Sequence, residues 1–271
     1  MKSQLAQLPN GMTVHSIRRE EALLMYGEVG NYIKHDLNLS AGATVVDVGA
    51  NIGIFSLWAH EMCAGDVQVY AFEPIPQIFD LLQANFMRIA PHNLHAFQMG
   101  LSDRAQDITF AYYPNASFAS TAYPDSTQQD QHLTKTLLQR SLHQLPAPLS
   151  WIQALPKRLQ TPFIHLIAQF INRRQFVTCQ LKTLSQFIHD KHLERIDFLK
   201  IDAEKSELDV LHGINDADWN KIQQVFIEVH NRDNRLEKIV HLLEAHGFTT
   251  IIHEQEPFFA DTEIHALFAK R

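Results

Sequence analysis

The stretch Ala43-Thr-Val-Val-Asp-Val-Gly-Ala-Asn-Ile-Gly53 decides the fold class of this chain. Residues 43–48 are β-branched and apolar on both faces, which is typical of a central parallel strand covered on both sides. The glycines after them end the strand, and a helix is expected over 54–62. Downstream, the pattern predicts a strand over 67–74, a helix over 76–89 and a strand over 94–99. Strands that alternate with helices predict a parallel sheet with helices on both of its faces.

This alternation is interrupted by residues 112–178, which contain several prolines and helical patches. We expect a mainly helical insertion there. It acts either as a lid over a substrate or only as an additional layer packed on the domain. Residues 1–40 form an N-terminal segment before this pattern, in which we expect a short strand over 13–17 and a helix near 29–37. Four further strands are expected after the insertion, the last two as a terminal antiparallel hairpin, over 196–202, 224–230, 248–253 and 264–270. The sequence therefore predicts a single α/β domain over 1–271, Rossmann-like and doubly wound, with about seven strands, most of them parallel.

The composition is that of an ordinary globular protein. The chain has 271 residues, of which 45% are hydrophobic and 20% charged, and its net charge is −7. A mildly acidic chain does not carry the strongly basic footprint of a nucleic-acid binder. The two cysteines, Cys63 and Cys179, form no disulfide framework and favour a reducing, cytoplasmic setting. Neither an apolar secretory core at the N-terminus nor a stretch of about 20 apolar residues occurs, so we expect no membrane span.

The turn after the first buried strand is a candidate cofactor site, because ligands of open α/β sheets lie beyond the carboxyl ends of the strands. It reads Asp47-x-Gly49-x-Asn51-x-Gly53, and Glu73 ends the next strand 20 residues after Gly53. A carboxylate in that place can accept hydrogen bonds from the ribose hydroxyls of an adenosine. The turn lacks the G-x-G-x-x-G pattern of dinucleotide binders. The acid Asp47 suits a cationic sulfonium better than a pyrophosphate, which favours S-adenosylmethionine over a nicotinamide cofactor.

Candidate catalytic residues follow two later strands. Asp202 ends one of them, and Glu228 and His230 end the other, on one face because side chains alternate along a strand. If the two strands are neighbours, these side chains converge. We assign His230 as general base with Glu228 as its orienting partner, and Asp202 as the residue that positions the donor, the acceptor or a metal. A plain surface histidine remains the alternative. Two carboxylates and an imidazole could also bind a divalent ion such as Mg²⁺ or Mn²⁺.

Several of these segments together resemble one known family. VVDVGANIGIFSL, AFEP, GLSD, IDFLKIDAEKSELDVLHG and FIEVH occur in order between about Thr44 and His230, and this series is similar to the FkbM family of methyltransferases. The resemblance implies a class I methyltransferase fold, S-adenosylmethionine as donor, and transfer to a hydroxyl oxygen of a polyketide, a nonribosomal peptide or a sugar.

The resemblance also implies roles for individual residues. Gly49, Asn51 and Gly53 would line the methionine part of the cofactor. Glu73 would hold the ribose, and Ser102 and Asp103 would flank the adenine. One position departs from the family, whose pattern is usually Asp-x-Glu-Gly-x-Glu. Here Lys205 stands where that pattern has glycine, between Glu204 and Glu207, and puts the usual substrate geometry in doubt. Acids at those two places also stabilise a helix N-terminus, which is an alternative role for them.

The insertion is basic, whereas the rest of the chain is acidic. It holds six Lys/Arg against two acids, which gives it a net charge of +4. A basic lid favours an anionic partner, such as an acidic acyl or peptidyl carrier protein that delivers a small-molecule substrate. An ordinary solvated helix face is the alternative.

Four functions remain open on the sequence. The first is O-methylation of a specialised metabolite. The second is O-methylation of a sugar, for which aromatic platforms would be Tyr112, Tyr113, Tyr123 and Trp151. The others are an NAD-type oxidoreductase and a non-catalytic binding module, for which Lys205 is the only hint.

Overall fold

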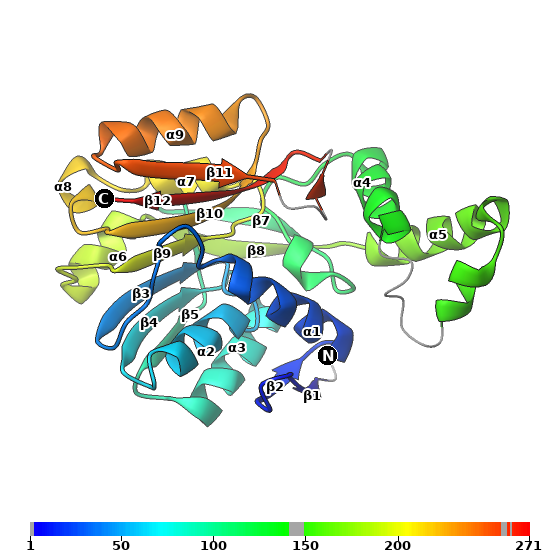
Figure 1. Ribbon diagram of the computed structural model, residues 1–271, viewed down its shortest axis with the longest axis horizontal. Coiled ribbons are helices and arrows are strands. Elements are labelled where there is room, and N and C mark those ends of the chain that lie inside the picture. Colours follow the sequence, from blue (N-terminus) through cyan, green and yellow to red (C-terminus); the bar gives the residue numbers. More distant parts are fainter. Residues whose placement is uncertain (1–2, 141–148, 256–258, 261) are drawn as a thin grey trace.

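A seven-stranded mixed sheet forms the centre of the protein (Figure 1). The computed structural model describes residues 3–140, 149–255, 259–260 and 262–271, with only the backbone of 127–130. The strand order is β11-β12-β10-β9-β3-β4-β5, and only β12 runs antiparallel to its neighbours. The strands are β3 (Ala43–Val48), β4 (Val67–Phe72), β5 (Leu94–Phe97), β9 (Phe198–Ile201), β10 (Gln224–His230), β11 (Thr250–Glu254) and β12 (Ile264–Lys270). The predicted doubly wound sheet with a terminal antiparallel hairpin is confirmed.

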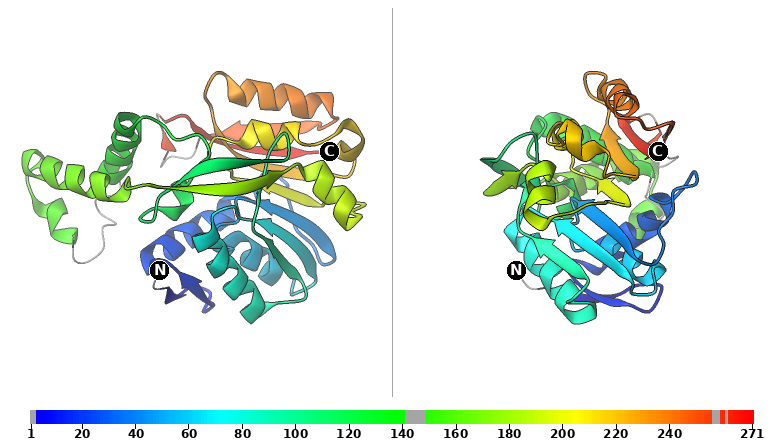
Figure 2. Two further views of the ribbon diagram at one scale, coloured as in Figure 1. Left: turned by 180° about the vertical axis from the view of Figure 1, so that it is seen from behind. Right: turned by 90° about the vertical axis from the view of Figure 1, so that its left-hand side faces the viewer.

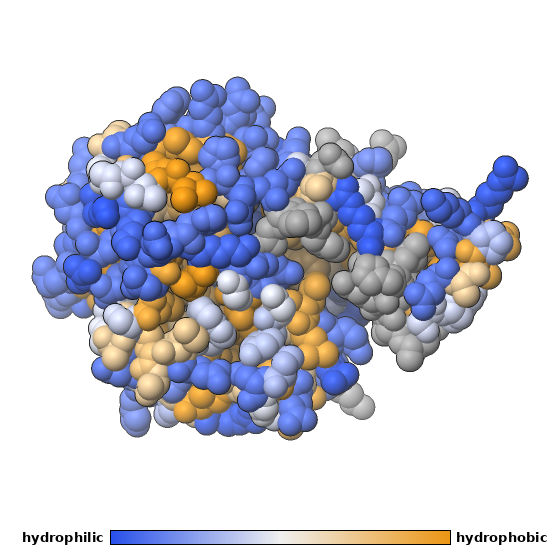
Figure 3. Space-filling model, viewed as in Figure 1, coloured by the Kyte–Doolittle hydropathy of each residue, from blue (hydrophilic) through white to orange (hydrophobic). Residues whose placement is uncertain are grey.

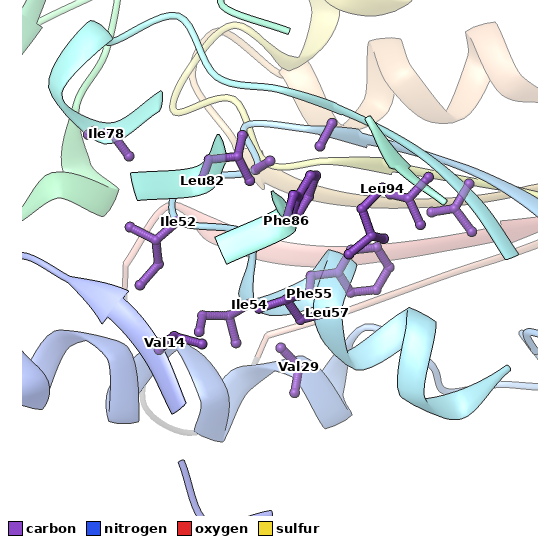
Figure 4. Close-up of a cluster of buried hydrophobic side chains, with 14 of the residues drawn as sticks. Val14, Val29, Ile52, Ile54, Phe55, Leu57, Ile78, Leu82, Phe86 and Leu94 are labelled. Atoms are coloured by element: carbon purple, nitrogen blue, oxygen red, sulfur yellow. The ribbon is translucent and has the colours of Figure 1, made fainter. Parts of the chain in front are cut away.

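Helices cover both faces of this sheet because the buried strands are apolar on both sides (Figures 1 and 2). On one face lie α1 (Arg19–Glu28), α2 (Ile54–Met62) and α3 (Pro76–Ile89). Their side chains form a core with Val45 and Val69 of the sheet, part of which is drawn in Figure 4. On the other face lie α6 (Leu184–Lys191), α7 (Glu207–His212), α8 (Asp216–Trp219) and α9 (Arg235–Ala245). Val46 and Val48 point to that second core, as the alternation of side chains along a strand requires.

The N-terminal region differs from the prediction in one respect. A hairpin of β1 (Gln4–Gln7) and β2 (Thr13–Ser16) is present, close to the strand expected over 13–17. The helix expected near 29–37 is wrong. The helix is α1, which ends at Glu28, and a single 3₁₀ turn, η1 (Val29–Asn31), follows it. Left-handed backbone at His35 and Asp36 prevents helical geometry further along.

The insertion is framed by two strands that the sequence did not indicate. β7 (Gln106–Tyr112) and β8 (Gln175–Lys182) pair antiparallel, and β6 (Gly100–Leu101) joins them in a three-stranded sheet. Residues 175–178, expected in the helical insertion, therefore belong to a strand. Between these strands lie the helical segments η2 (Ser117–Ala119), α4 (Thr127–Arg140), η4 (Ser150–Ala154) and α5 (Lys157–Ile171). α4 and α5 form an arm that extends away from the central sheet (Figure 1).

None of the helices in the described part of the chain combines the length and the apolar character that crossing a bilayer requires.

Candidate active site at the carboxyl ends of the strands

A cavity of about 830 Å³ lies at the carboxyl ends of β3, β4, β9 and β10, where open α/β sheets bind their ligands. Its outer wall is the arm, which contributes apolar side chains from α4 and α5: Leu133, Leu137, Leu166, Ile167, Phe170 and Ile171. Hydrophobic residues also follow the side of the body that faces the arm (Figure 3). The cavity therefore joins a polar floor at the sheet to an apolar outer wall.

The glycine turn after β3 is built for close approach of the chain to itself. Gly49 has a φ of 74°, and a Cβ on it would lie 1.8 Å from the backbone oxygen of Asp202. Only glycine therefore lets the ends of β3 and β9 meet. Gly53 has a φ of 88°, and its missing Cβ would lie 2.7 Å from side-chain atoms of Leu82 and Phe86 in α3. Gly49 and Asn51 line the cavity, whereas Gly53 faces α3, and the resemblance had placed it at the cofactor.

Asp47 lies beneath the cavity and is satisfied by protein groups. Its carboxylate is fully buried, accepts a hydrogen bond from Ser56 Oγ at 2.7 Å and lies 3.1 Å from Lys200 Nζ. Lys200 also lies 3.4 Å from Asp202. Burial alone would lower the pKa of Lys200, but Asp47 and Asp202 outweigh it and raise that pKa, so the ammonium stays charged. The charge of Asp47 thus meets Lys200 rather than a cationic ligand, contrary to the argument from the sequence.

Glu73 lies at the end of β4 and lines the cavity. Its carboxylate accepts hydrogen bonds from the backbone nitrogens of Ile75 at 2.8 Å and Asn51 at 3.1 Å. Burial raises the pKa of Glu73 to about 7. Ser102 also lines the cavity, and its hydroxyl donates to Asp103 at 3.2 Å. Asp103 itself is partly exposed beside Arg104.

The strands β9 and β10 are neighbours, as the sequence argument required, so the catalytic candidates converge. His230 lies at their centre. Its Nδ1 lies 2.8 Å from Glu207 Oε1, and its Nε2 lies 3.2 Å from Glu204 Oε2. Burial would lower the pKa of His230, but the two carboxylates raise it well above its usual value. The imidazole is therefore held as a cation with both nitrogens engaged. In this arrangement it has no free lone pair with which to accept a proton.

The partners of His230 differ from those that the sequence indicated. Glu207, not Glu228, orients the ring, and Glu207 is itself held by Arg235 Nη1 at 2.8 Å. Asp202 is turned toward Lys200. Single ligand atoms of Glu204, Glu228 and His230 all lie within 4.8 Å of one another, an arrangement that could hold a metal ion. Burial and the neighbouring carboxylates of Asp202 and Glu204 raise the pKa of Glu228 well above its usual value.

Sequence reasoning missed three groups of this site. Glu204 and Glu207 were treated as helix-start acids as readily as functional ones. Lys200 was read only as part of a strand, although a lysine inside the buried run Phe-Leu-Lys-Ile is itself a signal. A buried ammonium needs a buried carboxylate partner, and Asp47 on the adjacent strand is that partner.

Lys205 connects the turn after β9 to the segment that leads into the arm. Both Glu204 and Lys205 have left-handed backbone, with φ of 43° and 78°, which is strained for residues other than glycine. The Lys205 ammonium lies 3.0 Å from Asp125, and Arg232 contacts the same carboxylate. The hydroxyl of Thr121 donates to the backbone oxygen of Glu204. The side-chain ammonium of Lys205 is thus paired with Asp125 rather than with Glu204 or Glu207.

The sheet order, the antiparallel terminal hairpin, the glycine turn and the acid ending β4 together define a class I S-adenosylmethionine-dependent methyltransferase fold. A family model described as the methyltransferase FkbM domain matches residues 47–250. The chain belongs to the FkbM family of methyltransferases, as the motifs indicated, which sets aside the nicotinamide oxidoreductase.

Curated relatives agree with this membership. The 31-O-demethyl-FK506 methyltransferase FkbM of Streptomyces tacrolimicus is 37% identical over 270 residues, which are 98% of this chain and 96% of that protein. The AMB antimetabolite synthetase AmbE of Pseudomonas aeruginosa is 33% identical over 97% of this chain, which spans only 12% of that protein. A crystal structure of a methyltransferase FkbM from Methylobacillus flagellatus KT superposes with a TM-score of 0.52 at 15% identity, covering 92% of this chain and 52% of that one. At that identity the superposition shows the fold alone.

The structure predicts that Gly53→Ala destabilises the fold by about 1–3 kcal/mol and leaves cofactor affinity unchanged, because the added methyl group collides with α3. Gly11→Ala is the matched control, since Gly11 has a similar φ of 86° and nothing within 4 Å of its missing Cβ. Chemical denaturation should show a larger loss for Gly53→Ala than for the control. Equal losses would mean that α3 imposes no steric demand there.

Asp125→Asn should lower the free energy of unfolding by about 1–3 kcal/mol, because it leaves the buried Lys205 ammonium without its counter-charge. Glu254→Gln is the control, since Glu254 pairs with Lys34 where both side chains are about one-third exposed, and exposed pairs contribute about 0–1 kcal/mol. If denaturation gives the same small loss for both variants, Asp125 does not hold the turn.

Proposed function

We propose that this protein transfers the methyl group of S-adenosylmethionine to a hydroxyl oxygen of a specialised metabolite, such as a polyketide or nonribosomal peptide. The observation that carries the proposal is the group Glu204, Glu228 and His230, which lies in the same cavity as the glycine turn and Glu73. Oxygen methylation needs a donor and a proton-handling group within reach of one acceptor. A relative 37% identical over nearly its whole length is a methyltransferase named for an oxygen position.

In this proposal the cofactor lies across the ends of β3 and β4. Gly49 and Asn51 border its methionine part, Glu73 accepts hydrogen bonds from its ribose hydroxyls, and Ser102 borders its adenine. Exposure to the cavity supports these four roles. Asp47 and Gly53 then act from beneath, the first by holding Lys200 and the second by allowing α3 to pack. Asp103 acts through its hydrogen bond with Ser102.

The acceptor hydroxyl lies beside Glu228 and His230. His230 is already cationic, so it cannot accept the proton of this hydroxyl. The groups that can accept it are the carboxylates of Asp202, Glu204 and Glu228, all three of which line the cavity. The imidazolium then stabilises negative charge that develops on the acceptor oxygen, a role served best by a preorganised donor.

The apolar side chains with which the arm lines the cavity favour a bulky apolar acceptor over a sugar. A sugar site would use exposed aromatic platforms, but Tyr112 and Tyr113 are buried in the core. Trp151 packs edge-on against Phe163 and is absent from the lining of the cavity. Of the four aromatic residues that the sequence offered for a sugar, Tyr123 alone lines the cavity, and its hydroxyl donates to Asp209 at 2.6 Å.

Delivery of this acceptor on a carrier protein is the finer part of the proposal. Lys157, Arg158 and Arg173 are exposed on or beside α5, where they can attract the acidic surface of an acyl or peptidyl carrier protein. AmbE, a synthetase, contains a segment 33% identical to this chain. The arm would then receive the partner at its outer side and the acceptor at its inner side.

Calorimetric titration with S-adenosylhomocysteine tests the cofactor site. Its affinity should rise between about pH 6 and about pH 8, because a carboxylate with a pKa near 7 becomes a full acceptor for the ribose hydroxyls as it ionises. Glu73→Gln should weaken binding by about 1–3 kcal/mol and remove this pH dependence. Unchanged affinity in that variant would take Glu73 out of the ribose role.

Turnover tests the catalytic group. Glu228→Gln should lower kcat by about 10²–10⁴-fold with S-adenosylhomocysteine affinity retained. Glu237→Gln, at an exposed acid on α9, is the control with normal turnover. Methyl transfer is followed by mass spectrometry on hydroxylated polyketide and peptide acceptors, free and carrier-bound. Full activity of Glu228→Gln would show that the chemistry lies elsewhere in the cavity.

A further inference from the structure

The floor of the cavity carries more negative than positive charge. Five carboxylates gather around the ends of β9 and β10, against three cations, Lys200, His230 and Arg235. The carboxylates are Asp47, Asp202, Glu204, Glu207 and Glu228. A partly buried group of like charges is costly without further compensation. The site is therefore suited to a cation beyond those that the described chain supplies.

Glu228 is the carboxylate of this group that has no direct partner in the described part of the chain, although the charges of His230 and Lys200 act on it from nearby. Among the described residues no hydrogen bond or ion pair reaches its side chain, although its neighbours Asp202 and His230 are both paired. It lines the cavity on the same strand face as His230, two residues away. One oxygen of Glu204, one of Glu228 and one nitrogen of His230 lie within 4.8 Å of one another. This spacing would allow a single ion to bind between them.

Glu207 supplies an independent indication. A histidine that binds a metal through one nitrogen usually donates its other N–H to a carboxylate, which fixes the ring. Glu207 is fully buried and lies 2.8 Å from His230 Nδ1. It also accepts from the backbone nitrogen of Lys205 and pairs with Arg235. Its orientation is thus set by groups outside the three candidate ligands, and it directs Nε2 toward Glu204 and Glu228.

We propose that Glu204, Glu228 and His230 Nε2 bind a divalent cation, Mn²⁺ or Mg²⁺, with its remaining positions open to the cavity. Two carboxylate oxygens and one imidazole nitrogen suit these ions, and the nitrogen favours Mn²⁺ over Mg²⁺. Asp202, the acid that the sequence assigned to such a set, remains with Lys200. On binding, the Nε2 proton leaves to solvent and a metal–nitrogen bond takes its place.

The role of the ion rests on the proposed function. With the ion bound, the cation would replace the His230 imidazolium as the group that stabilises charge on the acceptor oxygen. It would lower the pKa of a coordinated acceptor hydroxyl, and Asp202, which is not a ligand, would receive the proton. The ion would also fix the direction from which the oxygen meets the methyl group. Glu207 is then a positioning residue for the ligand His230.

The first experiment measures Mn²⁺ binding by electron paramagnetic resonance, using the full chain freed of metal by EDTA and dialysis. We expect one site, with Mn²⁺ affinity reduced at least tenfold in Glu204→Gln and in Glu228→Gln, and retained in Glu237→Gln. Glu207→Gln should weaken binding by about 10–100-fold, as is usual for a group that orients a metal ligand. Pulsed measurements should show coupling to one imidazole nitrogen, which is lost in His230→Asn. Circular dichroism confirms that each variant is folded.

These results separate the metal from the methyl transfer. If methyl transfer occurs but Mn²⁺ does not bind, or binds equally in all variants, the metal site is wrong and the proposed function stands. If Mn²⁺ binds as expected and neither cofactor binding nor methylation occurs, the metal site stands and the proposed function fails. A protein that binds both should lose methylation on EDTA treatment and recover it on addition of Mn²⁺; activity unaffected by EDTA would overturn the catalytic role.

Discussion

The buried ion pair between Lys200 and Asp47 is the interaction on which the rest of the site depends. The two residues face each other in register on adjacent strands, both at most 3% exposed, and Lys200 Nζ also reaches the carbonyl of Gly49 and the carboxylate of Asp202. One ammonium thus joins the end of β3, the glycine turn and the end of β9. A buried pair adds little stability against an apolar alternative, but loss of one partner leaves a charge stranded at a cost of about 3–5 kcal/mol. The pair therefore fixes the geometry of the cavity floor more than it stabilises the sheet.

Beside this pair, the carboxylates that surround His230 are held by contacts from other parts of the chain. Glu207 is set by Arg235 at the start of α9, and the Glu204–Lys205 turn is set by Thr121 and Asp125, which precede the arm. Lys205 takes a left-handed conformation that glycine would adopt without strain. The ion pair with Asp125 ties this turn to the segment that leads into the arm, and so links the floor of the cavity to its outer wall.

The central sheet and the convergence of the candidate residues could be predicted from the sequence because both follow from periodicity. The run around Val45 and Val46 is apolar on both faces, and Glu228 and His230 share a face because side chains alternate. The choice of partners could not be predicted. The sequence alone does not tell whether Glu207 or Glu228 contacts His230. The direction that α7 takes after β9 brings Glu207 to Nδ1. The strands β7 and β8 escaped detection because their pairing joins residues far apart in the chain, and β8 follows directly on the apolar helix α5.

The pairing of Tyr112 with Gln175 brings the two ends of the insertion side by side on an antiparallel ribbon. Because the closing geometry is supplied by the ribbon, a longer or shorter arm changes the entropy of loop closure only slowly, by about 0.6 kcal/mol for each doubling of length. A change in the length of the arm is therefore expected to cost the sheet little through loop-closure entropy. The ribbon thus acts as a clamp at the base of the arm: it separates the geometry of the strands that carry the glycine turn and Glu73 from the length of the segment that walls the cavity.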